Sequence, residues 1–223
     1  MKTFNYVRAP ILAELSAEIT DVGRMYTTPE GNIYPSVTTV LSDGSKKGIE
    51  AWKARVGAEE ARKISYQASL RGTAVHSICE DYLKNDSNYS SGRMPNNMFS
   101  FRQIQPILDK HVDNIHYLEA PLYSDYLKVA GRVDCIAEYD GKLSIVDFKT
   151  SRRSKKIEWI TNYFMQESAY AVMYEERTGI PVSQLVTIIT VDDSESQVFV
   201  QQRDDHIFKF MEQSQLFKKK YNV

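Results

Sequence analysis

The sequence is poor in cysteine. Its 223 residues include only Cys79 and Cys135, which lie far apart and form no Cys-x-x-Cys pair. Zinc sites, iron–sulfur clusters and disulfide frameworks all need cysteines at short, regular spacings. The sequence therefore predicts none of the three, and a reducing, intracellular setting is expected.

Three further features are absent from the sequence: a long apolar run at its start, a phosphate-binding loop motif and an excess of positive charge. The first twenty residues contain no apolar run of secretory or membrane-spanning length, so neither export nor a membrane partner is expected. No Gly-x-x-x-x-Gly-Lys-Ser/Thr motif occurs, so any unwinding of a duplex would have to come from another protein. Lysine and arginine total 28 against 29 acidic residues, and this balance restricts any phosphate-binding surface to a local patch.

What the chain does contain is the composition of a folded protein. The hydrophobic fraction is 42% and the charged fraction 26%, close to the averages for globular domains. A chain of this length fills one core, so we expect a single domain over residues 1–223. Residues 1–35 are expected to lie at its periphery.

Hydrophobic periodicity predicts several helices. Residues 36–41 could begin a helix or form a short β-rich stretch, and the helix start is favoured because Ser36 is a good N-cap. Pro106 should begin or kink a helix rather than lie within one. The composition of residues 24–36 predicts a turn or hairpin, and that of residues 85–98 predicts an exposed loop. The remaining helices are expected over 49–63, 66–83, 101–112, 157–176 and 204–221.

Alternating and β-branched apolar residues predict strands in the second half of the chain. Three consecutive strands are expected between residues 115 and 150, the last two joined by a tight turn at Asp140-Gly141. Two more strands are expected over 183–191 and 197–201. Together with the helices they predict an α/β protein.

The strongest functional signal lies on two of these strands. Residues 131–134 read Gly-Arg-Val-Asp, and residues 146–150 read Val-Asp-Phe-Lys-Thr. A tight turn brings Asp134 and Asp147 to one end, and strand alternation puts Asp147 and Lys149 on one face. Paired carboxylates suit Mg²⁺, with Mn²⁺ as a substitute, and such an ion activates water against a phosphodiester. A neighbouring lysine orients that water or stabilises the developing charge.

A plainer interpretation is that these residues are solvated charges at strand ends, as single aspartates and lysines commonly are. The apolar segment 143–148 argues against it, because charge is depleted from strand interiors. The pattern therefore favours a hydrolytic metal site at Asp134, Asp147 and Lys149.

Four motifs in this order resemble the PD-(D/E)XK nuclease superfamily, in the branch that includes the RecB nuclease domain. They are the two strand segments, Gln166 followed by Tyr170, and an upstream helix with Arg71-Gly72-Thr73, His76 and Glu80. Residues 34–41 and those after Asp134 resemble exonucleases of the mitochondrial genome maintenance type and their phage-type relatives. The resemblance spans residues 34–175, with the motif core over 70–175.

The resemblance implies a fold and a set of roles. A mixed central sheet would be flanked by helices. His76, Asp134 and Asp147 would bind the metal together with the backbone carbonyl of Phe148, and Lys149 would be catalytic. The family pattern permits either Asp or Glu at position 147.

His76 also has an interpretation that involves no metal. A lone histidine on an apolar helix is more often packed or hydrogen-bonded than a ligand, and the surrounding motif is what favours a metal role. Glu80, on the same helix face, would orient His76 or bind a second metal, and the orienting role is favoured. Glu119, on the preceding strand, is a weaker candidate for the same roles.

Substrate contacts are expected from two motifs of the resemblance. Gln166 and Tyr170 share a helix face and would contact the DNA strand or buttress the site. Their alternative is ordinary helix surface, with Tyr170 packed on Phe164 or Met173. Arg71, at the start of the histidine motif, is a further candidate for contact with the strand.

The basic run 151–156 directly follows the catalytic strand. Its cations, Arg152 and Arg153 among them, would lie beside the metal site where a phosphate backbone must pass, although a solvated loop is the alternative. Unpaired bases would stack on exposed aromatic residues, for which the candidates are Trp52, Trp159, Tyr163 and Phe164.

The leading hypothesis is a metal-dependent DNA exonuclease that prefers single-stranded ends. An endonuclease of the same fold and a catalytically inactive DNA-binding protein are the alternatives. DNA and replication or recombination proteins are the expected partners. The phage-type resemblance predicts the cytoplasm of a bacterial or phage-infected cell.

Overall fold

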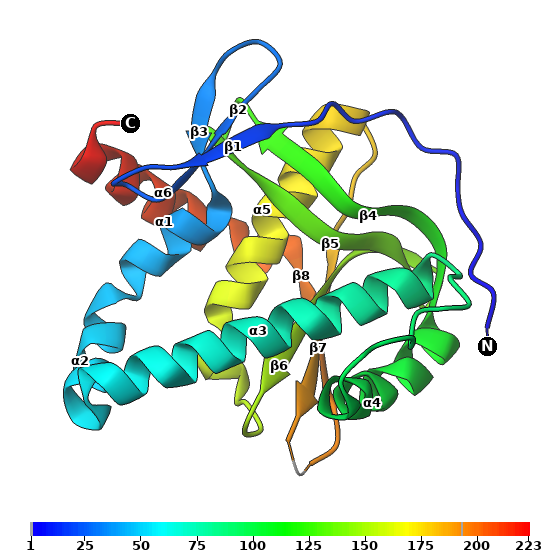
Figure 1. The fold of residues 1–223 in the computed structure, drawn as a ribbon. Helices are drawn as coiled ribbons and strands as arrows, with labels where there is room; N and C mark the ends of the chain where they lie inside the picture. The colour runs from blue at the N-terminus through cyan, green and yellow to red at the C-terminus, as the bar shows by residue number, and fades with distance from the viewer. Residues whose placement is uncertain (1, 193) are drawn as a thin grey trace.

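A computed structural model of the chain describes residues 2–192 and 194–223 (Figure 1). Its centre is a five-stranded sheet in the order β4-β5-β6-β7-β8, in which β6 and β7 are parallel and the other neighbours antiparallel. The mixed sheet predicted from the resemblance is confirmed. The strands are β4 (Val112–Ser124), β5 (Val129–Tyr139), β6 (Lys142–Ser151), β7 (Gln184–Val191) and β8 (Gln197–Gln202).

Two connections fix the order of the central strands. The turn between β5 and β6 has positive φ at Asp140 (52°) and Gly141 (73°), the geometry that matches the twist of a two-residue hairpin. This confirms the predicted turn. Parallel strands need a crossover, and α5 (Thr161–Thr178), preceded by the 3-10 turn η1 (Ile157–Trp159), carries the chain from β6 to β7.

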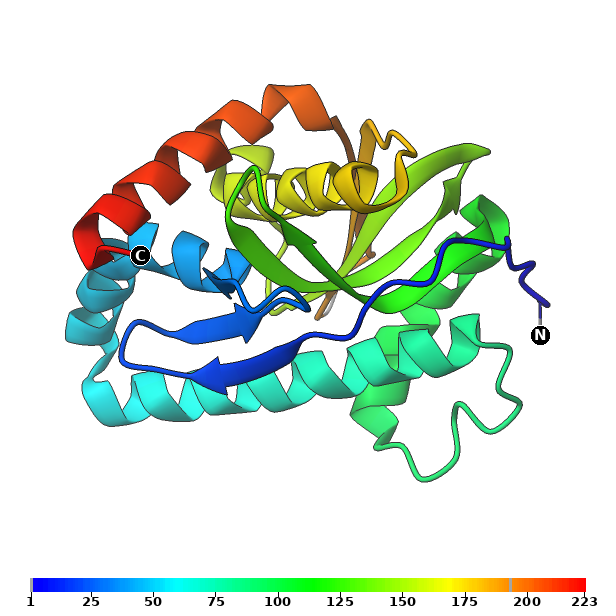
Figure 2. The same cartoon turned by 90° about the horizontal axis from the view of Figure 1, so that it is seen from above.

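Helices cover both faces of the sheet (Figure 2). One face packs on α5, α6 (Ile207–Tyr221) and α1 (Val37–Gly44), with the 3-10 turn η2 (Arg203–Asp205) leading into α6. The other face packs on α3 (Ala58–Leu83) and α4 (Pro95–His111). All residues of β7 are buried, as expected for a strand covered on both sides. In the described ranges, none of the helices has the length and apolar character needed to cross a bilayer.

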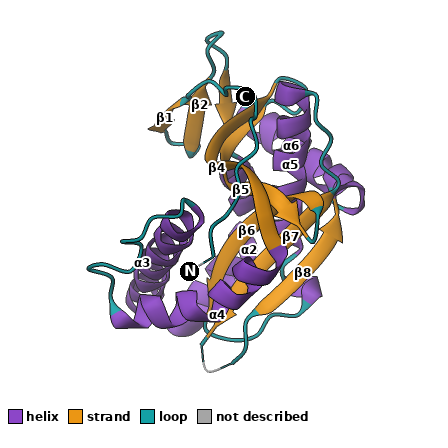
Figure 3. Cartoon of the chain, turned by 90° about the vertical axis from the view of Figure 1, so that its right-hand side faces the viewer, coloured by secondary structure: helices purple, strands orange, loops and turns teal. Residues whose placement is uncertain are grey.

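A small antiparallel sheet precedes these elements. It consists of β1 (Ser16–Ile19), β2 (Arg24–Thr27) and β3 (Ile33–Pro35), and it lies on the α3 side of the main sheet, against β5 (Figure 3). Ser36 then caps α1, because its Oγ accepts a hydrogen bond from the backbone N–H of Thr39 at 2.9 Å. The predicted hairpin and the predicted helix start are both confirmed.

The predicted division of the next two helices is wrong. A helix was expected over 49–63, but α2 (Lys46–Val56) ends at Gly57, whose φ of 89° is incompatible with a continuing right-handed helix. The following helix, α3, begins at Ala58 and continues without interruption to Leu83. The single glycine therefore outweighs the apolar spacing on either side of it.

The expectations around α4 also need correction. The exposed loop was expected to reach residue 98, but α4 begins at Pro95, where the missing N–H of a proline costs no helical hydrogen bond. Pro106 lies inside α4 rather than at its start. Phe101, Ile104 and Leu108 are completely buried around it, and this packing holds the helix across the proline.

Candidate active site

Asp134 lies where β5 and β6 stop pairing. Their ladder ends at Cys135 and Val146, and beyond it the Oδ2 of Asp134 accepts a hydrogen bond from the backbone N–H of Phe148 at 3.0 Å. The N–H and C=O of one strand residue point to the same edge, so the Phe148 carbonyl faces this opening too. The divergence of the two strands thus exposes both a carboxylate and a carbonyl at one end of the sheet.

His76 reaches the same point from α3. Its Nδ1 lies 3.2 Å from the Oδ2 of Asp134. Burial, the largest single effect, lowers the pKa of the imidazole, but the charge and the hydrogen bond of Asp134, together with the charge of Asp147, leave that pKa raised. The same contact lowers the pKa of Asp134 against the opposing effect of its burial. His76 on α3 and Asp134 on β5, which the sequence predicts to share one metal site, are therefore neighbours in the fold.

Glu119 completes a cluster with these two residues. The pairs Leu118–Cys135 and Ala120–Val133 flank it in the β4–β5 ladder, so Glu119 lies opposite Asp134. One ligand atom from each of His76, Glu119 and Asp134 lies within 4.8 Å of the others. Burial, and then the charge of Asp134, raise the pKa of Glu119 to about 7. Glu119, the weakest candidate from sequence, is therefore one of the best-placed donors.

Asp147 and Lys149 form a buried pair on β6. Strand alternation puts both on one face, and the Lys149 ammonium contacts the Asp147 carboxylate. Gln166 on α5 donates its Nε2–H to Asp147 Oδ1 at 3.2 Å. Burial raises the pKa of Asp147 to about 6 despite the lysine, whereas the two carboxylates raise the pKa of Lys149 against its own burial.

Tyr170 lies beneath the strand rather than on a surface. Its side chain is only 3% exposed, and a Cβ added to Gly131 would lie 2.8 Å from its ring. Gly131 is therefore the residue that lets β5 pack over Tyr170. Of the two roles expected for Tyr170, this geometry favours buttressing over direct contact with DNA.

Glu80 has a different partner from the expected one. It forms an ion pair with Lys84, one helical turn further along, at 2.5 Å, while His76 faces Asp134. Among the described residues, no hydrogen bond or ion pair joins Glu80 to His76. Glu80 does line the cavity that contains the cluster, a space of about 600 Å³.

The chemistry of these donors fits a divalent cation. Two carboxylates and an imidazole converge, and the raised pKa of Asp147 reflects a buried carboxylate beside a second one, Asp134. A cation with a preference for oxygen ligands would relieve that repulsion. The residues that could hold it are His76, Asp134, Asp147, Glu119 and the Phe148 carbonyl.

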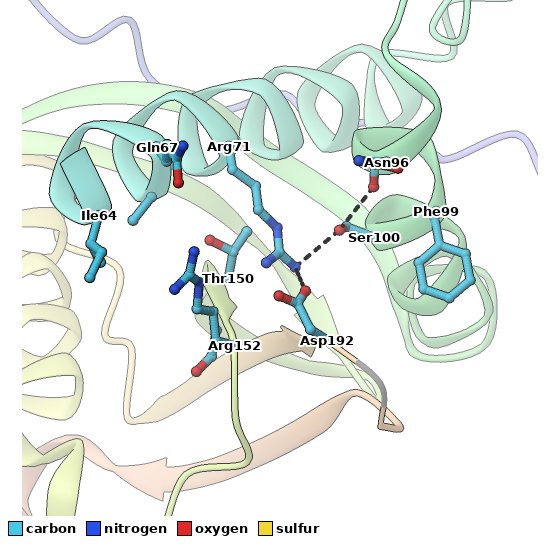
Figure 4. A pocket seen from close by; sticks show the side chains of 11 residues that line it. Ile64, Gln67, Arg71, Asn96, Phe99, Ser100, Thr150, Arg152 and Asp192 are labelled. Carbon is cyan, nitrogen blue, oxygen red and sulfur yellow. Dashed lines mark hydrogen bonds and ion pairs between the residues drawn. The ribbon is translucent and has the colours of Figure 1, made fainter. Parts of the chain in front are cut away.

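A second cavity, of about 490 Å³, adjoins the site at Thr150, the residue after Lys149 (Figure 4). Arg71 and Arg152 both line it. Arg71 is held by Asp192 at 2.5 Å and by the Ser100 hydroxyl at 3.1 Å. Arg153 is exposed outside this lining.

The candidate aromatic residues differ in accessibility. Trp159 is 66% exposed, and Lys156 lies 5.3 Å from its ring centre. Tyr163 is half-buried with Lys149 Nζ 5.2 Å from its ring centre, and Trp52 is also half-buried. Phe164 is 1% exposed and belongs to the core. Trp159 is thus the member of the set that is open to a base.

Three residues near the site were not singled out from sequence. Arg24 and Arg132 line the cavity with His76, and Arg132 also pairs with Glu14 at 2.9 Å. Glu167 is completely buried and accepts a hydrogen bond from the Thr187 hydroxyl. Burial and nearby Asp147 raise its pKa well above the usual range. Arg132 and Glu167 are parts of the recognised motifs, whereas no sequence signal indicates Arg24.

The chain is similar to named exonucleases over part of its length. It is 30% identical over 134 residues to mitochondrial genome maintenance exonuclease 1 of Mus musculus and 32% identical over 134 residues to that of Homo sapiens. These matches cover 56% of this chain but 39% and 38% of the two relatives. A crystal structure of an exonuclease candidate from Eubacterium rectale aligns with a TM-score of 0.44 and 14% identity, covering 66% of this chain and 64% of that one.

The sequence profile of a nuclease superfamily matches most of the chain. It extends over residues 52–220, from α2 to the end of α6. This range contains the mixed sheet and every residue of the His76, Asp134, Asp147 and Lys149 constellation. The chain belongs to the PD-(D/E)XK nuclease superfamily.

Proposed function

We propose that this protein is a metal-dependent deoxyribonuclease that hydrolyses phosphodiester bonds from DNA ends. The observation that carries the proposal is the convergence of His76, Glu119 and Asp134 next to the buried Asp147–Lys149 pair. Carboxylates with an imidazole form a donor set for a divalent cation. Mg²⁺ is the proposed ion, with Mn²⁺ as a substitute.

In this proposal the ion-binding residues are His76, Asp134, Asp147 and the Phe148 carbonyl. When bound, the cation supplies activation of water and neutralises charge on the phosphate. Glu119, opposite Asp134, would act as a further ligand or hold a bound water.

Lys149 has an electrostatic role in the proposal. Asp147 and Asp134 raise the pKa of Lys149 against the effect of its burial, and this favours the ammonium form. A fixed ammonium stabilises the negative charge that develops on the phosphate, or orients the attacking water. Gln166 fixes Asp147, Tyr170 supports the strand below Asp134, and Glu80, which pairs with Lys84, lines the cavity.

Single-stranded ends are the proposed substrate. Proteins that bind single strands combine cations along the backbone with aromatic rings on which bases stack. Trp159 is exposed directly after the basic run 151–156, and Arg152 is exposed within that run. The two relatives, which are 30% and 32% identical to this chain over 134 residues, are named exonucleases, and this also supports attack at ends. Replication or recombination proteins would supply unwound strands.

The test uses four substrates: end-labelled linear single strands, blunt linear duplex, circular single strands and circular duplex. Each is incubated with Mg²⁺ or with a chelator. We expect linear single strands to be degraded in Mg²⁺ alone, with slower loss of linear duplex and intact circles. Cleavage in chelator would overturn the metal requirement.

The same assay separates the competing functions. Linearisation of circles would favour an endonuclease of the same fold. Binding of single strands without cleavage in Mg²⁺ or Mn²⁺ would favour an inactive DNA-binding protein. Both results contradict the exonuclease proposal.

A further inference from the structure

We propose that the cavity between α3, α4 and the end of β6 is a nucleobase subsite, in which the ring of Phe99 stacks on an unpaired base. This inference rests on the proposed deoxyribonuclease function and names a part of the substrate that the catalytic residues do not contact. The cavity measures about 490 Å³ and lies beside Thr150 (Figure 4).

Phe99 is an exposed aromatic residue in the wall of this cavity. It lies in the first turns of α4, lines the cavity and is 60% exposed, whereas Phe101 on the same helix is completely buried. Single exposed phenylalanines are common on protein surfaces, but one that lines a cavity presents its ring there, and single-strand binders use such rings as stacking surfaces. Ile64 and Ala68 of α3 add apolar surface to the lining.

The cavity has polar groups suited to the rest of a nucleotide. Arg152 is exposed and has no ionic partner among residues 2–192 and 194–223, so it is free to contact a phosphate. Arg71 is fixed by Asp192 and Ser100, which join α3, β7 and α4 around the cavity and hold its shape. Asn96 provides an amide at the same wall for the edge of a base.

The cavity also lies next to the proposed metal site along α3. Arg71 lines it, and the next residue, Gly72, lines the cavity that contains His76 and Asp134. A Cβ at Gly72 would lie 4.0 Å from the Thr150 hydroxyl oxygen, so a larger side chain there would fill the space between the two cavities. A strand with its phosphate at the metal site would therefore bring a neighbouring base close to the Phe99 cavity.

Binding of fluorescein-labelled single-stranded oligonucleotides tests the subsite, with the Asp147→Asn substitution present in every protein to keep the strand intact. We expect Phe99→Ala to raise the Kd about tenfold. A second measurement uses a series of oligonucleotides, each with a single abasic site at a different position. At one of these positions the abasic site should raise the Kd of the parent protein by a similar factor. At that position Phe99→Ala should cause little further loss.

Phe208→Ala is the matched control, because Phe208 is 74% exposed on α6, away from the cavity. It should leave the Kd unchanged. A change below about twofold for Phe99→Ala, or an equal loss at every abasic position, would overturn the subsite while leaving the nuclease proposal intact. Absence of any single-strand binding by the parent protein would instead count against the proposed function itself.

Discussion

At the scale of single residues, the charge of Lys149 is the feature on which the chemistry depends. Asp147 and Asp134 keep the ammonium protonated within a buried site. Replacing Lys149 with methionine keeps much of its length and removes the charge. We expect the single-turnover rate of strand cleavage to fall about 100-fold, with a smaller change in DNA binding. Rapid-quench measurements at saturating enzyme give that rate directly.

Lys209→Met is the control for this prediction, because Lys209 is exposed on α6. Its rate should match that of the parent protein. A Lys149→Met enzyme that cleaves at the parent rate, or that loses only affinity for DNA, would show that Lys149 does not contribute to the chemical step.

Residue-scale prediction from sequence succeeded where spacing alone was enough. Asp147 and Lys149 lie on one face because strand side chains alternate, and the hairpin turn brings Asp134 near them. Glu119 was ranked low because its position opposite Asp134 depends on the register between β4 and β5. That register is set by packing along the whole strand and has no local signature.

At the scale of elements, the break between α2 and α3 is the clearest departure from the predicted pattern, and it can be tested. Gly57 has a φ of 89°, which a residue with a Cβ adopts only with strain. Gly57→Ala should therefore lower the free energy of unfolding by about 1 kcal/mol. Urea denaturation followed by circular dichroism measures this change.

Gly48 gives a matched comparison within α2. It has no positive φ, and a Cβ there would meet nothing within 4 Å. Gly48→Ala should raise the free energy of unfolding by up to about 1 kcal/mol, because alanine is the better helix former. Stabilisation by both substitutions would mean that one continuous helix runs through residue 57.

The sequence predicted well which segments form helices and strands, and less well where each element begins and ends. The strands were found because their apolar residues alternate and turn residues bound them, as at Asp140-Gly141. A helix was expected over 101–112, but Pro106 was not expected inside it, because local rules count the lost hydrogen bond but not the burial of Phe101, Ile104 and Leu108 around it.

At the scale of the whole molecule, stability should depend on pH and metal together. The pKa values of Glu119 and Asp147, about 7 and about 6, are raised by burial in the folded protein. The fold therefore binds these protons more tightly than the unfolded chain does, and it loses that stabilisation as pH rises through 6 to 7. Over the same window the ionised ligands become able to bind a cation.

The expected result is a larger rise of Tm on adding Mg²⁺ at about pH 8 than at about pH 5.5, each relative to chelator. Differential scanning fluorimetry in matched buffers measures it. Glu119→Gln should raise the Tm in chelator at the higher pH, because one buried negative charge is gone. An equal Mg²⁺ effect at both pH values would contradict the assignment of these carboxyls to the metal site.

The overall architecture was predictable, but the shape of the cavities was not. The ordered motifs indicate the superfamily and hence the mixed sheet. The Phe99 cavity and the position of Arg24 depend on how α4 and the small sheet pack beside α3, and these contacts join segments far apart in sequence.

The central claim is that Asp147 belongs to a hydrolytic metal site, and one rate comparison tests it most directly. Degradation of a linear, end-labelled single strand in Mg²⁺ is timed for the parent protein, Asp147→Asn and the control Asp21→Asn, whose side chain is exposed near β2. We predict a loss of about 100-fold or more for Asp147→Asn and none for Asp21→Asn. Degradation by Asp147→Asn at the rate of the parent protein would contradict the claim.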